Sequence, residues 1–273
     1  MNGDQHTVGT STGGVGGVSV WINGGDAPRE YSDFAISELL VWSRGLTEAE
    51  MYQASNHLLA NALGWALPPV SPPAPPSPPP SPPSPPPPPL SPVMLLDGVS
   101  AWYRPGEFNL ATGTWPDASG HGHTATLTGH GFLRVRESGH GALAAVTALH
   151  GTTASRVSFG NIIASSFTVC SATRYTGSLR ARILQGGSSS WLHGHWAGRA
   201  GVALYTTWRT TTVDHVSPET DWVVMCGTNA ESQLIPGNGV NVDPHPGGTS
   251  TGGVGGVAVW TNGGGGRRAV WGV

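Results

Sequence analysis

The chain has 273 residues and a formal net charge of −3, and only 11% of its residues are charged, against about 25% in an average soluble domain. This weak charge excludes an electrostatic nucleic-acid partner. No apolar run approaches the roughly 20 residues that span a bilayer, so we expect no membrane partner either. A folded surface this poor in charge needs another source of solubility, for which covalent glycan is a candidate.

The same glycine-rich sequence occurs near both ends of the chain. Residues 248–264 repeat residues 9–25, with Ala258 in place of Ser19 and Thr261 in place of Ile22. Self-similarity at a fixed offset is typical of repeating arrays. The first copy continues into a predicted strand and helix, whereas the second stops almost at once. We therefore expect one period of a repeating array, cut out of phase.

A strand and a helix are predicted after the first copy. Residues 33–42 are apolar on nearly both faces, which is typical of a buried strand. Thr47 and Glu50 then have the spacing of a capping box. This predicts a short helix that runs to about Leu63 and is closed by Gly64.

Residues 68–92 consist almost entirely of proline and serine. Proline fixes φ and lacks the N–H group, so this tract cannot join a helix or a sheet. We expect a stiff polyproline II rod of roughly 75–80 Å, at about 3.1 Å per residue. The tract divides the chain into residues 1–67, the linker 68–92 and a main domain at 93–273.

The main domain shows short apolar runs separated by turns rich in Gly, Ser, Asn and His. Strands are predicted at 97–103, 124–128, 155–159, 166–175, 181–185, 200–206, 220–228 and 255–261. Strands at this spacing, without intervening helices, favour an all-β antiparallel sandwich or jelly roll.

The two cysteines, Cys170 and Cys226, each lie in a strand-like run. Two interpretations stay open, because the sequence does not give the distance between them. Either both are buried free thiols, or they form one disulfide between neighbouring strands, as is favoured in a secreted protein.

Several histidines and tryptophans form local clusters. His121 with His123, and His193 with His195, are spaced to share one face of a strand. Flanking glycines favour exposed turn histidines over a metal site. Aromatic residues among polar neighbours, at Trp191, Trp196 and Trp208, suit either sugar rings or the core of a sandwich, and the core is favoured.

Several separated motifs resemble the laminin-G-like, concanavalin-A-like jelly-roll domains. Residues 96–103 and 115–127 look like the family's opening, and residues 167–169 like its middle strand. Residues 33–42, followed by 46–51, look like its closing strand and helix. The order is rotated, because the ending stands before the beginning. The resemblance implies a jelly roll whose closing elements lie in residues 1–67, which we call the donor segment. Its candidate contact residues are Phe34, Ile36, Leu40, Trp42 and Met51.

The resemblance also suggests a weak calcium site. Some jelly rolls of this class bind calcium through loop oxygens, and Asp97 and Asp117 fall in the opening motifs. Turn capping by Asp is the favoured interpretation. We expect no other metal and no cofactor.

The proline tract resembles the hydroxyproline-rich Ser-Pro tracts of green-algal cell-wall and matrix glycoproteins. This likeness implies hydroxylation and O-glycosylation of the tract, whereas no Asn-x-Ser/Thr site occurs for an N-glycan. The implied positions are Ser71, Pro72, Pro73, Pro75, Pro76, Ser77, Pro78, Pro79, Pro80, Ser81, Pro82, Pro83, Ser84, Pro85, Pro86, Pro87, Pro88 and Pro89.

A main domain without its closing strand exposes an unpaired edge. The rod is longer than a domain of this size is wide, so we expect residues 26–65 to complete a neighbouring molecule, head to tail. Head-to-tail contacts that do not close give filaments. The expected function is an extracellular structural glycoprotein, in a fibre or matrix of the cell wall or cell surface. Its units are joined by strand donation or tandem repetition.

Two other functions are weighed. The alternative to a structural protein is a carbohydrate-binding, lectin-like module with polysaccharide as its partner. A glycan hydrolase is a distant third, because the alternating Glu-x-Asp-x-x-Glu strand of the related glucanases is absent. We therefore expect no enzymatic activity.

Overall fold

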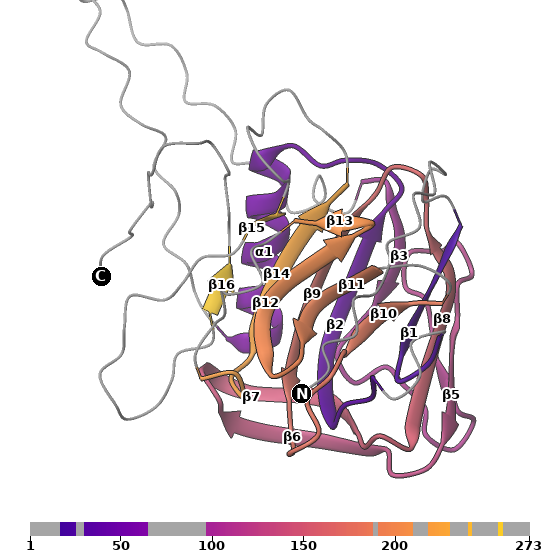
Figure 1. Ribbon diagram of the computed structural model, residues 1–273, viewed down its shortest axis with the longest axis vertical. Helices are drawn as coiled ribbons and strands as arrows, with labels where there is room; N and C mark the ends of the chain where they lie inside the picture. The colour runs from indigo at the N-terminus through magenta and orange to yellow at the C-terminus, as the bar shows by residue number, and fades with distance from the viewer. Residues whose placement is uncertain are drawn as a thin grey trace, which may run out of the picture.

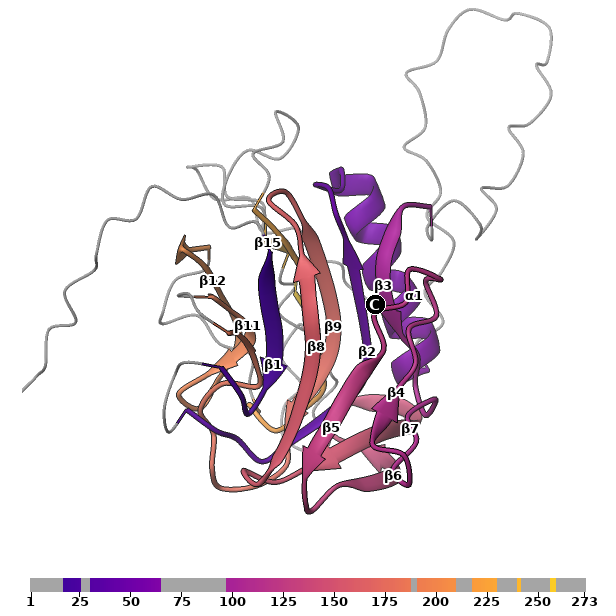
Figure 2. The same ribbon diagram turned by 90° about the vertical axis from the view of Figure 1, so that its right-hand side faces the viewer.

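The computed structural model describes residues 17–25, 30–64, 97–187, 191–209 and 218–229, with the short strands at 240–241 and 256–258. Two β-sheets face each other, and one helix covers the outer face of the second sheet (Figures 1 and 2). Both sheets are antiparallel, apart from one parallel pair in the second. The expected all-β class is confirmed at this level.

The first sheet has eight strands in one unbroken order. They are β13 (Thr207–Trp208), β12 (Arg199–Tyr205), β11 (Trp191–Trp196), β10 (Leu184–Gly186), β1 (Val18–Ile22), β8 (Ser155–Ile163), β5 (Ala125–Gly129) and β4 (Thr114–Trp115).

The second sheet also has eight strands, two of them beside its main path. The path is β15 (Val240–Asn241), β14 (Val223–Thr228), β9 (Thr168–Tyr175), β2 (Phe34–Trp42), β7 (Ala142–Gly151) and β6 (Leu133–Gly139). β3 (Val99–Tyr103) pairs with β2, and β16 (Gly256–Ala258) pairs in parallel with β14.

Strand β2 lies in the middle of the second sheet, and all nine of its residues are buried. Phe34 and Ile36 belong to the core between the sheets. Leu40 and Trp42 belong to a second core beneath the helix. A strand buried on both faces requires a nearly continuous apolar sequence, which is the pattern that predicted this strand.

Helix α1 (Glu48–Leu63) is the predicted helix, and its capping box is confirmed. The Thr47 side chain accepts a hydrogen bond from the Glu50 N–H, and the Glu50 carboxylate accepts one from the Thr47 N–H. Gly64 closes the helix with φ of 73°, and a Cβ there would lie 2.3 Å from the Ala144 Cβ. Glycine fits this end because it adopts a left-handed φ and has no side chain to clash.

Residues 30–64 dock against their own chain, contrary to the expectation that they complete a neighbour. β2 pairs with β9 over its whole length, with β3 in its second half and with β7 in its first. Met51 is buried in the second core. Thirty-two residues join Gly64 to Asp97, and the length expected for the tract has not prevented pairing of β2 with β3 of the same chain.

Sequence patterns missed four substantial strands, one of which is β1 in the first glycine-rich copy. β6, which pairs with β7 in a hairpin, is largely exposed, whereas β7 mixes buried, intermediate and exposed residues. β11 reads Trp-Leu-His-Gly-His-Trp. Exposed or glycine-interrupted strands show little alternation of apolar and polar residues in the sequence. Such strands form because of their contacts with neighbouring strands, which the local sequence does not reveal.

Candidate functional site

The proline tract leaves and re-enters the fold at opposite ends of α1. Gly64 follows the last turn of the helix. Gly98 immediately precedes β3. A Cβ at Gly98 would lie 3.6 Å from Nε of Arg44, a residue just before the start of the helix. The serines and prolines at 71–89 lie outside the described residues. Both attachment points therefore belong to one folded body.

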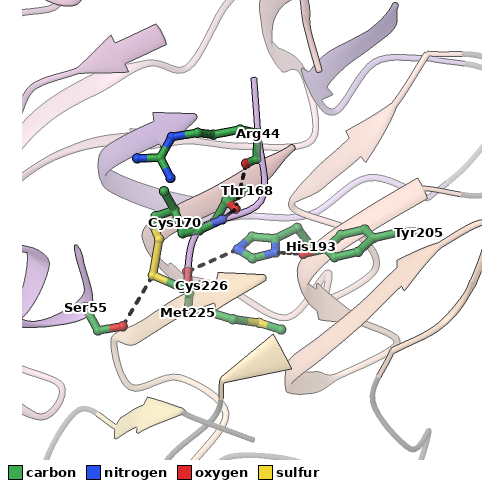
Figure 3. Close-up of a disulfide and its surroundings, with 9 residues drawn as sticks. Arg44, Ser55, Thr168, Cys170, His193, Tyr205, Met225 and Cys226 are labelled. Carbon is green, nitrogen blue, oxygen red and sulfur yellow. Dashed lines mark hydrogen bonds between the residues drawn. A yellow bond between two sulfur atoms is a disulfide. The ribbon is translucent and has the colours of Figure 1, made fainter. Parts of the chain in front are cut away.

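A disulfide joins β9 to β14 beneath the helix (Figure 3). Cys170 and Cys226 are directly opposite in the antiparallel register, and their sulfurs are 2.05 Å apart. Ser55 Oγ of α1 lies 3.3 Å from the Cys226 sulfur. Both cysteines are fully buried. The disulfide cross-links two neighbouring strands of the second sheet at the place where α1 packs on them.

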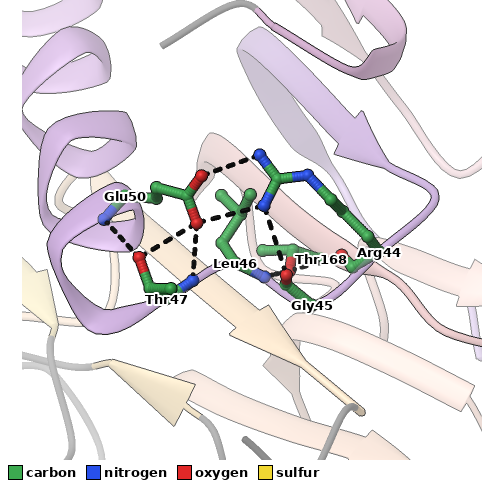
Figure 4. A network of polar contacts seen from close by, with 6 residues as sticks. All are labelled: Arg44, Gly45, Leu46, Thr47, Glu50 and Thr168. Atoms are coloured by element: carbon green, nitrogen blue, oxygen red, sulfur yellow. Dashed lines mark hydrogen bonds and ion pairs between the residues drawn. The ribbon is translucent and has the colours of Figure 1, made fainter. Parts of the chain in front are cut away.

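A polar network fixes the start of the helix next to this disulfide (Figure 4). The Thr168 hydroxyl donates to the Arg44 carbonyl and accepts from the Leu46 N–H. The Arg44 guanidinium pairs with Glu50 at 2.8 Å. This hydrogen bond from Arg44 is the main cause that lowers the pKa of Glu50 to about 2.

His193 and His195 are buried in the core, and the expectation of exposed turn histidines is wrong for this pair. His193 Nδ1 lies 2.6 Å from Tyr205 Oη, and its Nε2 lies 3.3 Å from the Met225 carbonyl oxygen. The carbonyl can only accept, so Nε2 carries the proton and Nδ1 accepts from the tyrosine. Burial lowers the pKa of His193 to about 4 and that of His195 to about 3, which keeps both rings neutral.

His121 lies on the surface, as expected, and His123 is partly buried. Among the residues that the structure describes, no group of three or more His, Cys, Asp or Glu side chains has the arrangement of a metal site.

The two calcium candidates, Asp97 and Asp117, have different surroundings. Asp97 is exposed in the turn before β3. Both Asp117 carboxylate oxygens accept hydrogen bonds, from the backbone N–H groups of Trp102, Ser119 and His123. These bonds hold the pKa of Asp117 below its usual value against the opposing effect of burial. Asp117 thus caps turns, which is the interpretation that the sequence favoured.

The clustered tryptophans divide between core and surface. Trp191 is fully buried, and its ring stacks with that of Tyr205. Trp196 and Trp208 are half-buried, and their ring centroids are 5.2 Å apart. Arg199 lies 5.7 Å from the centre of the Trp196 ring.

The outer face of the first sheet carries a row of directly opposite residues. Trp21 pairs with Gln185, Gln185 with Leu192, Leu192 with Leu204, and Leu204 with Trp208. Directly opposite residues of antiparallel strands share a face. An indole therefore stands at each end of a row that crosses five strands.

Sequence analysis overlooked one buried polar cluster. Glu38 Oε1 accepts a hydrogen bond from Trp102 Nε1 at 2.7 Å and lies 3.1 Å from His57 Nε2. The Asn61 amide nitrogen lies 2.9 Å from His57 Nδ1. When this amide donates, the imidazole proton sits on Nε2 and points at Glu38. The signal in the sequence was Glu38, the single carboxylate within the otherwise mostly apolar residues 34–42.

This cluster connects elements on both sides of the proline tract, because Glu38 is in β2, His57 in α1 and Trp102 in β3.

No family model, no curated protein and no solved structure matches the chain.

Proposed function

We propose that the chain is a structural glycoprotein of an extracellular matrix or cell wall. Its folded unit is a jelly roll of the laminin-G-like, concanavalin-A-like class, and its proline tract is hydroxylated and O-glycosylated. One observation carries this proposal: the tract is inserted between α1 and β3, two elements of the same body. An insertion at this point of the chain leaves the pairing of β2 with β3 intact.

The disulfide supports the extracellular location. Disulfides form and persist mainly in oxidising compartments, and Cys170–Cys226 closes a sequence separation of 56 residues. Within the described residues, no helix is long and apolar enough to cross a membrane.

The duplication supports assembly into a fibre or matrix. The described sandwich takes its β1 from the first glycine-rich copy, and the second copy pairs elsewhere. One chain thus holds a complete unit and a surplus strand sequence. We do not propose residues 30–64 as the connecting segment, because β2 and α1 pack within their own sandwich. We propose that units connect by tandem repetition or through the second copy.

The decisive experiment is chemical analysis of protein isolated from its native source. Proteolytic peptides spanning residues 65–96 are expected to contain hydroxyproline and to exceed their sequence mass by whole sugar units. Electron microscopy of the same material is expected to show regularly spaced globules. Unmodified tract peptides from monomeric protein would refute the proposal.

A carbohydrate-binding module is the second candidate, favoured by the half-buried Trp196–Trp208 pair. Indole rings stack on apolar sugar faces, and a nearby guanidinium can bond sugar hydroxyls. On this hypothesis, Trp196→Ala with Trp208→Ala abolishes binding on a glycan array. Leu133→Ala, an exposed leucine of β6, serves as the matched control and leaves binding unchanged.

A further inference from the structure

Two nearly identical segments of this chain have different partners. β1, from the first copy, is antiparallel to both β8 and β10 inside the first sheet. β16, from the second copy, is parallel to β14 at the second sheet (Figure 1). Residues 256–258 correspond to residues 17–19 at the repeat offset, since 256 − 239 = 17. The same sequence therefore has two acceptor positions in the fold.

The place that β1 takes in the first sheet suits the first glycine-rich copy better than the second. Ile22 is fully buried, opposite Val157 and Leu184. The second copy has Thr261 at this place, and a hydroxyl buried among apolar groups without a partner is unfavourable.

Asn23 adds a second restriction. Its side chain accepts from the Ser32 N–H at 2.7 Å and donates to the Thr152 and Ser155 carbonyls at 2.9 and 3.1 Å. The residue at the Ser32 position after the second copy is Trp271, and the sequence around it has diverged. The first copy is thus the better occupant of the first sheet, and the second copy remains for another acceptor.

Strand β14 is a well-defined acceptor. On one side it pairs with β9 over its six residues. On the other side β15 covers Cys226 and Gly227, which leaves the stretch Val223–Met225 for β16. The disulfide from Cys226 to β9 holds this edge rigid. An edge with free N–H and C=O groups accepts an added strand.

We propose that the Val223–Met225 edge of β14 is a β-augmentation site for the second glycine-rich copy of another molecule of this chain. The proposal rests on the fibre or matrix function and names its joint. Donor and acceptor are different surfaces of one chain, so the contact is heterologous and extends without closing.

In the structure, β16 pairs with β14 of its own chain. Protein concentration determines whether this pairing forms within one molecule or between two molecules. Fourteen residues separate Asn241 of β15 from Gly256 of β16. A short linker of this kind gives an effective concentration on the order of millimolar. Exchange between molecules therefore prevails in packed material and reverses on dilution.

The test is sedimentation of the full chain over a wide concentration range. The mass of the wild-type protein is expected to rise without a fixed limit as concentration approaches millimolar. Val257→Pro with Ala258→Pro removes strand hydrogen-bond donors and is expected to leave a folded monomer. Thr261→Pro with Asn262→Pro, outside the described strand β16, is the matched control and is expected to associate like the wild type.

A peptide of residues 248–264 provides an independent readout. It is expected to bind the Val257→Pro, Ala258→Pro chain saturably and to shorten wild-type assemblies. If the wild type assembles but the proline pair changes nothing, the β14 joint is refuted while the fibre function stands. If the wild type remains monomeric throughout, both the joint and non-covalent fibre assembly are refuted.

Discussion

At the scale of single residues, the buried histidines have the clearest energetic consequence. Tyr205, Thr173, Tyr175 and the Met225 carbonyl surround the His193–His195 pair. None of these groups carries a negative charge at neutral pH, so protonation would place uncompensated charge in the core. In the unfolded chain both imidazoles regain a pKa near 6.5. The unfolded state therefore binds more protons than the folded state below that pH.

We predict that the free energy of unfolding falls as the pH drops from about 6.5 toward 4, by about 3 kcal/mol for each histidine. Stability is complete above the unfolded pKa and is lost on acidification, because both folded values are depressed. Urea unfolding at a series of pH values measures this. His195→Phe is expected to remove about half of the slope. An unchanged slope in that variant would contradict the assignment.

At the scale of elements, we expect the stability of α1 to depend on its N-cap and on the disulfide that lies beneath it. Thr47→Ala removes the N-cap hydrogen bond to the Glu50 N–H. We predict a loss of about 1 kcal/mol in the free energy of unfolding. Ser43→Ala, at an exposed neighbouring position, is the control and is expected to change it by less than about 0.5 kcal/mol. Denaturant titration of both variants checks the difference, and equal effects would argue against a role for the cap.

The disulfide is the second element-scale prediction. Cys170→Ala with Cys226→Ala opens a loop with a sequence separation of 56 residues. The chain-entropy relation predicts a loss of about 4 kcal/mol. Guanidinium unfolding of the folded double variant measures the loss. A loss below about 1 kcal/mol would show that the β9–β14 pairing and the helix hold the region without the bond.

The sequence predicted α1 and β2 well because each has a strong local signal. Thr47 with Glu50 marks a helix start, and residues 34–42 are apolar except for Ser37 and Glu38. The outward row from Trp21 to Trp208 was not predictable, because its members are distant in sequence and meet only through strand register. The burial of His193 and His195 was not predictable either, because the glycines beside them are typical of a turn.

At the scale of the whole molecule, the proline tract connects two parts of one body. We predict that replacing residues 65–96 with twelve Gly and Ser residues preserves a folded monomer. Twelve residues reach about 40 Å, which exceeds the length of α1, roughly 24 Å at 1.5 Å per residue. Thermal unfolding and light scattering test this. A dimer formed by the shortened chain would show that its two parts complete different molecules.

Because β2 lies in the middle of the second sheet, it is synthesised long before the strand that pairs with it along its whole length. Its main partner β9 lies 126 to 141 positions later in the chain, from Trp42 opposite Thr168 to Phe34 opposite Tyr175. At roughly 5–20 residues per second, a ribosome needs several seconds to deliver that partner. Throughout this interval a nine-residue strand with seven apolar residues has left the exit tunnel before the strand that pairs with it has been made. We therefore expect the nascent chain to be most prone to aggregation in the period between the synthesis of β2 and that of β9.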